Sequence, residues 1–193
     1  MKRIGLTGGI GTGKSTVARL FHELGAIPVI DADQIARELR APGGEAEAPL
    51  LKRFNTLDPS KLRELLTKDP AAKKDLEGIL HPLIQRKSEE AFKNAERLSS
   101  TAPFLLYEAS LLIESGRAPD FDRVIVVTSP LPDRLVRIMN RDGVSQDSAL
   151  KMIEAQSPDS YRAKHADVLI DNRGSMEDLK ANVLKVLDQM KSS

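Results

Sequence analysis

The sequence predicts an α/β fold in which a five-stranded parallel β-sheet is flanked by helices. Short apolar stretches alternate with longer segments of helical period, which is the pattern of βαβ units. A glycine-rich turn joins the first expected strand to the first expected helix. The 193 residues, 40% of them hydrophobic and 30% charged, suffice to bury a core without disulfides. A single domain is therefore expected.

Five stretches with β character define the strands of the predicted sheet. They cover residues 2–7, 26–30, 103–107, 123–128 and 167–170. A first helix is expected over residues 14–24, where apolar side chains fall on one helical face, namely Val17, Leu20, Phe21 and Leu24. Gly25 marks the expected C-terminal stop of this helix. An amphipathic helix over residues 176–190 completes the pattern.

Residues 45–98 lack β character and carry apolar residues at helical intervals, so a helical insertion is expected. Asp-Pro pairs at 58–59 and 69–70 each place a capping Asp before a Pro, which predicts two helix starts. His81 precedes Pro82 where another long helix is expected to begin. The predicted organisation is a core of residues 1–40, 99–130 and 166–193, an insertion of residues 41–98, and a charged helical segment of residues 131–165.

Composition and charge exclude several classes of partner. The 29 Lys and Arg residues balance 28 Asp and Glu residues, so no broad basic field favours nucleic acid or a membrane surface. Five Phe, two Tyr and no Trp leave few platforms on which bases could stack. The absence of Cys rules out disulfides and thiolate zinc sites. With no signal peptide or membrane-spanning stretch in the sequence, a cytoplasmic location is expected.

A phosphate-binding loop is predicted between the first strand and the first helix. Residues 8–15, GGIGTGKS, fit the pattern G-x-x-x-x-G-K-[ST]. Glycines allow the backbone N–H groups to point at phosphate oxygens, the Lys supplies a positive charge to the β- and γ-phosphates, and the Ser hydroxyl suits Mg²⁺. The predicted ATP-binding residues here are Gly9, Ile10, Gly11, Thr12, Gly13, Lys14, Ser15 and Thr16, with Ser15 as metal ligand. A Rossmann dinucleotide site fits less well, because its pattern lacks the Gly-Lys-Ser ending.

Carboxylates follow two of the predicted strands. Asp31 and Asp33 lie at the carboxyl end of the second strand, the edge where a parallel sheet binds ligands. Asp33 is a candidate base for an acceptor hydroxyl, and the alternative is that Asp31 or Asp33 only caps the next helix. Glu108 follows the strand at residues 103–107, where an acidic residue can order the water shell of Mg²⁺. The alternative for Glu108 is a solvated loop residue.

Three arginines fall on one face of the expected helix that starts near residue 131. Arg134, Arg137 and Arg141 are spaced three and four residues apart. Their planar guanidinium groups suit the spread charge of a transferring phosphoryl group. The alternative is a solvated face whose arginines pair with Asp133 and Asp142, and for Arg134 this alternative is favoured.

These features indicate a phosphoryl transferase that acts on a small molecule. The sequence has no N-K-x-D motif for guanine selection, which disfavours a regulatory GTPase. A helical insertion after the second strand and an arginine-bearing helical segment are typical of small-molecule kinases. Two alternatives are a nucleoside monophosphate kinase and a nucleotide-dependent switch that acts through a protein partner.

Motifs spread along the chain carry a resemblance to a known family. They are GLTGGIGTGKSTVA at 5–18, DAD at 31–33, LHPLI at 80–84, LVRIMNRDG at 135–143 and IDNRG at 170–174. Together they resemble the dephospho-CoA kinase family nearly from end to end. Thr12 stands where Ser is commoner, Glu108 and Ser110 stand where the family usually has Asp and Pro, and Arg162 stands where Lys is usual.

The resemblance implies a P-loop nucleoside-triphosphate hydrolase fold with a helical acceptor-binding insertion and a helical lid. It implies ATP-dependent phosphorylation of the ribose 3′-hydroxyl of dephospho-CoA, the last step of coenzyme A biosynthesis, with Mg²⁺. The residues that it implies are Asp33 as base, Lys14, Arg137 and Arg141 on the phosphates, His81 and Glu108 at the acceptor, and Asn172 and Gly174 near the adenine. The oligomeric state is not determined by the sequence, and a monomer is compatible with it.

Overall fold

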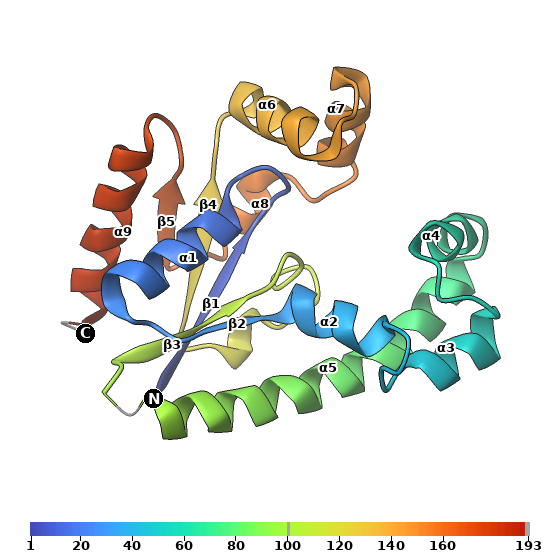
Figure 1. Cartoon of the computed structure of the whole chain (residues 1–193). Coiled ribbons are helices and arrows are strands. Elements are labelled where there is room, and N and C mark those ends of the chain that lie inside the picture. The colour runs from blue at the N-terminus through green and yellow to red at the C-terminus, as the bar shows by residue number, and fades with distance from the viewer. Residues whose placement is uncertain (100, 192–193) are drawn as a thin grey trace. The chain divides into compact units, whose positions relative to one another are not determined.

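The computed structural model describes residues 1–99 and 101–191 of the chain (Figure 1). Its contacts divide the chain into two compact units, which we call the sheet unit (Met1–Ile30 with Ala95–Ser193) and the helical unit (Asp31–Asn94). The helical unit is one continuous insertion between two parts of the sheet unit. It begins at Asp31, and the predicted insertion of residues 41–98 lies mostly within it.

The sheet unit is built on five strands, as predicted. They are β1 (Lys2–Gly8), β2 (Val29–Asp31), β3 (Phe104–Glu108), β4 (Arg123–Thr128) and β5 (Val168–Asp171). Their order in the sheet is β2-β3-β1-β4-β5. Strand β1 pairs in parallel with β3 and β4, and β4 pairs in parallel with β5. The loop that follows β1 therefore leaves from the middle of the carboxyl edge of the sheet.

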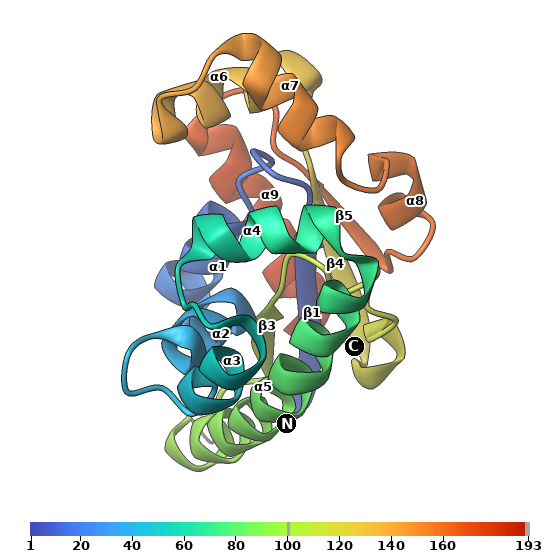
Figure 2. The same ribbon diagram turned by 90° about the vertical axis from the view of Figure 1, so that its right-hand side faces the viewer.

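Two helices from opposite ends of the chain cover one face of this sheet. Helices α1 (Lys14–Gly25) and α9 (Met176–Lys191) lie side by side in both views (Figures 1 and 2). Their apolar faces and the strand side chains beneath them form one core, which includes Val17, Leu20, Phe21, Ile125, Leu179, Val183 and Leu187. Leu24, expected on the buried face, is 39% exposed in the last turn of α1.

The segment after β3 covers the opposite face of β1. The Tyr107 and Phe121 rings stack with their centroids 5.1 Å apart. A Cβ atom on Gly5 of β1 would lie 2.9 Å from Leu112 Cδ1, so the close approach of this segment requires glycine. The 3₁₀ helix η1 (Ala118–Asp120) lies in this segment.

Three helices make up residues 131–163 of the sheet unit. They are α6 (Leu131–Asp142), α7 (Gln146–Glu154) and α8 (Asp159–Ala163). Helices α6 and α7 lie side by side in both views, and α8 contacts β4 (Figures 1 and 2). This arrangement confirms the helical character expected for residues 131–165.

The helical unit has its own core. It contains α2 (Ala32–Arg40), α3 (Glu47–Phe54), α4 (Pro59–Lys68) and most of α5 (Pro70–Leu98), and its buried apolar residues include Leu39, Leu50, Phe54, Leu62 and Leu80. The predicted helix starts at both Asp-Pro pairs are confirmed. Asp58 accepts hydrogen bonds from the N–H groups of Ser60 and Lys61 at 2.8 and 2.9 Å.

The expected helix start at His81 is wrong, because α5 runs without a break through Pro82. A proline inside a helix removes one backbone hydrogen bond. Apolar side chains on both sides of Pro82 pack into the core of the helical unit, among them Leu76, Ile79, Leu80, Leu83 and Ile84. We infer that this packing keeps the helix continuous.

At the end of α1, one residue packs closely against α9 and its neighbour adopts the left-handed backbone conformation. Gly25 is the last helical residue, and a Cβ atom there would lie 2.8 Å from Leu187 Cδ2 on α9. The left-handed residue expected at a glycine is instead the exposed Ala26, with φ 51°. Glycine at 25 is thus required by the packing of α1 on α9, and an alanine carries the strained backbone.

Opposite substitutions at these two positions are expected to change stability in opposite directions. Ala26→Gly should raise the free energy of unfolding by about 1 kcal/mol, because glycine adopts a positive φ without strain. Gly25→Ala should lower it by about 1–3 kcal/mol through overpacking against Leu187. Urea unfolding of both variants measures the two changes. A fall in stability for Ala26→Gly would contradict this description of the helix end.

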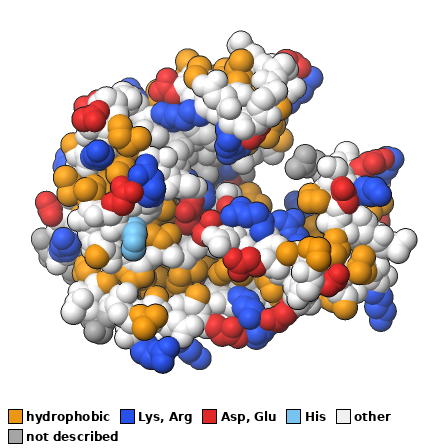
Figure 3. Space-filling model, in the orientation of Figure 1, with side chains coloured by type: hydrophobic (Ala, Val, Ile, Leu, Met, Phe, Trp, Pro, Cys, Tyr) orange, Lys and Arg blue, Asp and Glu red, His pale blue; other side chains and the backbone are white. Residues whose placement is uncertain are grey.

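The surface carries charges of both signs. Figure 3 shows acidic and basic side chains interspersed with apolar ones on the face drawn there, in line with a net charge of +1. Among residues 1–99 and 101–191, no helix combines the length and apolar character needed to cross a bilayer.

Candidate nucleotide-binding site

The loop between β1 and α1 depends on glycine at defined positions. Gly11 and Gly13 have φ angles of 77° and 89°, which other residues adopt only with strain. A Cβ atom on Gly13 would lie 2.2 Å from Nδ2 of Asn172. The buried Thr12 closes the loop, since its Oγ1 donates to the Gly9 carbonyl at 2.8 Å. The predicted phosphate loop is therefore formed as its pattern requires.

A cluster of polar groups, the buried Lys14 and Glu108 with the exposed Ser15, lies where the loop enters α1. Lys14 Nζ and Ser15 Oγ each donate to Glu108 Oε1 at 2.6 Å. Glu108 is the last residue of β3 and is only 3% exposed, so the alternative of a solvated loop residue is wrong. The register that pairs Leu6 with Glu108 brings this carboxylate beside the loop.

The donor set at this position suits a hard divalent cation. The Ser15 hydroxyl and the Glu108 carboxylate are oxygen groups 2.6 Å apart, and Mg²⁺ prefers oxygen ligands. Within the described part of the chain, no group of three or more His, Asp or Glu side chains is gathered as a metal site. A magnesium ion here would thus take one or two protein ligands and complete its shell with water and phosphate oxygens.

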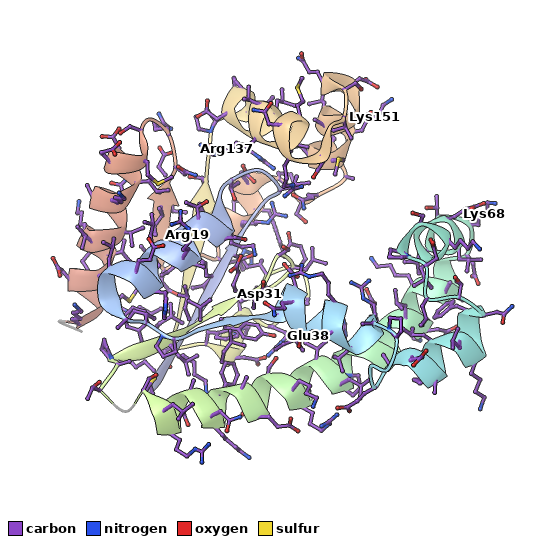
Figure 4. All side chains as sticks on the ribbon, in the orientation of Figure 1. Arg19, Asp31, Glu38, Lys68, Arg137 and Lys151 are labelled. Carbon is purple, nitrogen blue, oxygen red and sulfur yellow. The ribbon has the colours of Figure 1, made fainter. Side chains whose placement is uncertain are left out.

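Arg137, one of the three arginines predicted to share a helical face, extends from α6 to the loop. Its Nη1 donates to the Gly11 carbonyl at 3.1 Å and to Ser129 Oγ at 2.8 Å, and its Nη2 donates to the Asn172 carbonyl at 3.2 Å (Figure 4). These bonds place a half-buried positive charge against the backbone of the loop.

Arg141 has a different environment. Its guanidinium forms two hydrogen bonds of 2.7 Å with the neighbouring Asp142 carboxylate, and its side chain is 60% exposed. The hydrogen bond from Arg141 holds the pKa of Asp142 below its usual range. The structure therefore shows for Arg141 the Asp142 pairing that the sequence left as an alternative, and its role on the phosphates stays a prediction.

The interpretation of Arg134 as a solvated residue is wrong. Arg134 is 5% exposed, donates from Nε to the Ile10 carbonyl at 2.8 Å, and forms an ion pair of 2.8 Å with Asp159. Arg134 and Ile138 are the two buried residues of α6 and share one helical face. The four-residue spacing between Arg134 and the apolar Ile138 is a sequence signal that could have indicated burial of Arg134. Nothing in the sequence pairs Arg134 with Asp159 on α8.

Two further residues near the loop have structural partners. Asn172 is 7% exposed, and its Nδ2 donates to the Thr12 carbonyl at 2.8 Å. Gln156 Oε1, which the sequence did not single out as a site residue, accepts the Ile10 N–H at 2.8 Å. Gly174 has φ 90° in the turn before α9. The expected positions of Asn172 and Gly174 near an adenine stay predictions.

The structure gives different positions to the two aspartates where β2 ends and α2 begins. Asp31 is the N-cap of α2, because its Oδ1 accepts the Gln34 N–H at 2.9 Å (Figure 4). Asp33 is half-buried in the first turn of α2. Helix capping is thus confirmed for Asp31 and leaves Asp33 as the candidate base. His81 is an exposed residue within α5, and its contact with the acceptor stays a prediction.

Comparisons with known proteins place the chain in a family. The family model for dephospho-CoA kinase matches residues 2–178. The dephospho-CoA kinase of Geobacter metallireducens is 39% identical over 189 residues, which cover 94% of this chain and 92% of that protein. The enzyme of that name from Corynebacterium glutamicum is 38% identical over 198 residues, with 98% and 100% coverage.

Solved structures are also similar to this chain. TT1252 from Thermus thermophilus has a TM-score of 0.83 at 35% identity, with 97% of both chains covered. Dephospho-CoA kinase from Campylobacter jejuni has a TM-score of 0.70 at 28% identity, with 98% and 97% covered. Shikimate kinase from Acinetobacter baumannii, at 18% identity, TM-score 0.56 and 100% and 96% coverage, shares the fold alone. The fold is that of the P-loop kinases, and the chain belongs to the dephospho-CoA kinase family.

Proposed function

We propose that this chain transfers the γ-phosphoryl group of ATP to the ribose 3′-hydroxyl of dephospho-CoA, giving CoA and ADP. The observation that carries the proposal is the family match over residues 2–178, which contains the whole phosphate loop together with Lys14, Ser15 and Glu108. The reaction forms a bond from the 3′-oxygen to the γ-phosphorus and breaks the bond from that phosphorus to the oxygen bridging the β-phosphate. The hydroxyl proton leaves to a base.

The loop and its charges would stabilise the transferring group. N–H groups of a glycine-rich loop and the start of α1 attract phosphate oxygens, and Lys14 adds a full positive charge. Arg137 and Arg141 are proposed to complete the positive environment of the phosphates from α6. Preorganised groups of this kind supply most of the rate enhancement in phosphoryl transfer.

Ser15 is proposed to hold Mg²⁺, with Glu108 beside it ordering the metal's water. When bound, the ion neutralises negative charge on the β- and γ-phosphates. In the structure Lys14 and Ser15 both donate to Glu108, so these three residues must exchange partners when the nucleotide and its ion bind.

Acceptor chemistry is assigned to the insertion. We propose that Asp33 accepts the proton of the 3′-hydroxyl and that His81 contacts the acceptor from α5. Residues 41–98 would bind dephospho-CoA, and residues 131–165 would act as a lid over the nucleotide. The predicted absence of nucleic-acid and membrane partners and the cytoplasmic location stay predictions.

Release of ADP across a panel of acceptors tests this function. The protein is incubated with ATP and Mg²⁺ plus dephospho-CoA, nucleosides or nucleoside monophosphates, and ADP is measured with time. Stimulation by dephospho-CoA with formation of CoA supports the proposal. Preference for a nucleoside monophosphate would support a different small-molecule kinase, and slow ATP hydrolysis that no acceptor stimulates would support a nucleotide-dependent switch.

Arg141→Ala tests the proposed role of this exposed arginine. The substitution should lower kcat by about 10-fold or more, because a charge-assisted bond to a phosphate oxygen contributes about 1.5–3 kcal/mol. Stability should change by less than about 1 kcal/mol, since exposed ion pairs contribute little. Initial rates and thermal unfolding measure the two effects. Unchanged kcat would assign Arg141 to its surface pair with Asp142 alone.

A further inference from the structure

Three successive carbonyl groups of the phosphate loop accept hydrogen bonds from side chains outside the loop. Ile10 O accepts from Arg134 Nε at 2.8 Å, Gly11 O accepts from Arg137 Nη1 at 3.1 Å, and Thr12 O accepts from Asn172 Nδ2 at 2.8 Å. The first donor, Arg134, has no role in the function proposed above. Arg134 contacts a backbone carbonyl of the loop and the Asp159 carboxylate, whereas an arginine that binds a ligand directs its guanidinium at the ligand.

Arg134 is held in place by the partly buried acid Asp159. Asp159 Oδ2 lies 2.8 Å from Arg134 Nη1, and Asp159 Oδ1 lies 3.3 Å from Arg162 Nη1. Arg162 is fully buried, donates to the Ser157 carbonyl at 2.8 Å and pairs with Glu114 at 2.5 Å. Asp159 thus joins two guanidinium groups, and with Glu114 the four side chains carry no net charge.

The environment of Arg134 favours an acidic partner such as Asp159. Burial is the main cause that lowers the pKa of Arg134, and the charge of Arg162 acts in the same direction. The charge of Asp159 opposes both effects. A buried charge without a partner is strongly unfavourable, so the Asp159 carboxylate stabilises Arg134 in its position at the loop.

The same side chains lie directly against the loop backbone. A Cβ atom on Gly9 would be 2.7 Å from Arg134 Nη2, 3.1 Å from Asp159 Oδ1 and 3.2 Å from Arg162 Nη1. Gly9 does not have a positive φ, so the close approach of these side chains, and not the backbone conformation, disfavours a larger residue there. The cluster and the second residue of the loop therefore fit each other.

Peptide geometry links this cluster to phosphate binding. In a trans peptide the C=O and the following N–H point in opposite directions. The bond from Arg134 to the Ile10 carbonyl therefore fixes the direction of the Gly11 N–H. Gln156 takes the Ile10 N–H itself. A loop with two left-handed glycines can otherwise rotate its peptide planes, and a carbonyl oxygen turned inward would repel phosphate.

We propose that Arg134 and Asp159 are positioning residues for ATP. Arg134 holds the Ile10–Gly11 peptide plane so that loop N–H groups stay directed at the phosphates, and Asp159 holds Arg134. This inference rests on the proposed use of ATP but not on the identity of the acceptor.

Nucleotide affinity measured without an acceptor tests the inference. In calorimetric titration with ADP and Mg²⁺, the affinity of Arg134→Gln and of Asp159→Asn should be lower than that of the wild-type protein by about 10-fold or more. Arg134→Lys should recover part of this loss. In steady-state assays the KM for ATP should rise, while the KM for dephospho-CoA stays within about twofold. Three variants are measured so that the test can still be decided if one of them does not fold.

Arg117→Gln is the matched control. Arg117 is a partly buried arginine of the sheet unit that, like Arg134, has several polar partners, and it donates to Tyr107 Oη at 2.8 Å and to Asp120 at 3.0 Å. This variant should lower the melting temperature and leave ADP affinity unchanged. If Arg134→Gln behaves in the same way, Arg134 is a structural residue only and the inference is wrong.

A double-mutant cycle tests the contact with Gly9. Gly9→Ala should weaken ADP binding in the wild-type background, because the added methyl displaces Arg134. In an Arg134→Ala background the same substitution should have little further effect. Additive losses would contradict the inference. If the wild-type protein binds ADP but does not phosphorylate dephospho-CoA, the proposed function fails while these titrations still decide the role of Arg134.

Discussion

Replacement of Asp33 by Asn is expected to lower kcat for dephospho-CoA by roughly 10²–10⁴-fold, the usual contribution of a general base. Asn keeps the size and polarity of the side chain but cannot take up the 3′-hydroxyl proton. ADP affinity should stay within about twofold, because Asp33 is assigned to the acceptor and not to the phosphates. Single-turnover rates and calorimetric titration with ADP measure the two quantities.

Asp31 provides the control two residues away. It caps α2 through its bond with the Gln34 N–H. Asp31→Asn should leave both activity and stability nearly unchanged, since Asn is also a good N-cap, whereas Asp31→Ala should cost about 1 kcal/mol of stability. Near-normal turnover by Asp33→Asn, or an equal loss of turnover in Asp31→Asn, would contradict the assignment of the base to Asp33.

Replacement of Lys14 by Met is expected to lower kcat by roughly 10²–10³-fold, the range seen when one preorganised donor to a developing charge is removed. Met preserves the length of the side chain and removes its charge. The same substitution leaves Glu108, 3% exposed, without its cationic partner. The free energy of unfolding should therefore fall by about 3 kcal/mol. Rates and urea unfolding are both required.

The double variant Lys14→Met with Glu108→Gln separates these two effects. Because the uncompensated carboxylate is gone, most of the lost stability should return, but the rate should not. Recovery of the rate together with stability would mean that Lys14 acts through the fold and not on the phosphates.

The sequence predicted the elements whose signals are local. The five strands, the loop at residues 8–15 and the helix starts at both Asp-Pro pairs follow from patterns within a few residues, and all are present. The prediction at His81 was wrong because it weighed Pro82 alone. Packing of Leu80 and Leu83 in the core of the helical unit outweighs one lost backbone hydrogen bond. The left-handed Ala26 was missed because Gly25 offered the better local signal.

In the candidate site, too, the sequence predicted the residues that have a local signal and missed those that depend on packing. Lys14 and Ser15 are adjacent and belong to one motif, so the sequence identified them, and the pairing of β3 with β1 explains why Glu108 joins them. The partnership of Arg134 with Asp159 depends on how α6 and α8 pack, which no local pattern encodes. Charged residues of this kind read as solvated until their burial is known.

The central position of β1 has a consequence for the order of folding. Lys2 pairs with Phe104 and Ile4 pairs with Arg123, so β1 must wait for chain segments that are synthesised much later. The helical unit makes its contacts within residues 31–94 and can form earlier. The loop that leaves β1 takes its outer hydrogen-bond donors from residues 134, 137 and 172, which follow β4 or β5 in the chain. We therefore expect ADP to bind, and to stabilise, a sheet unit in which these late segments have come together with β1.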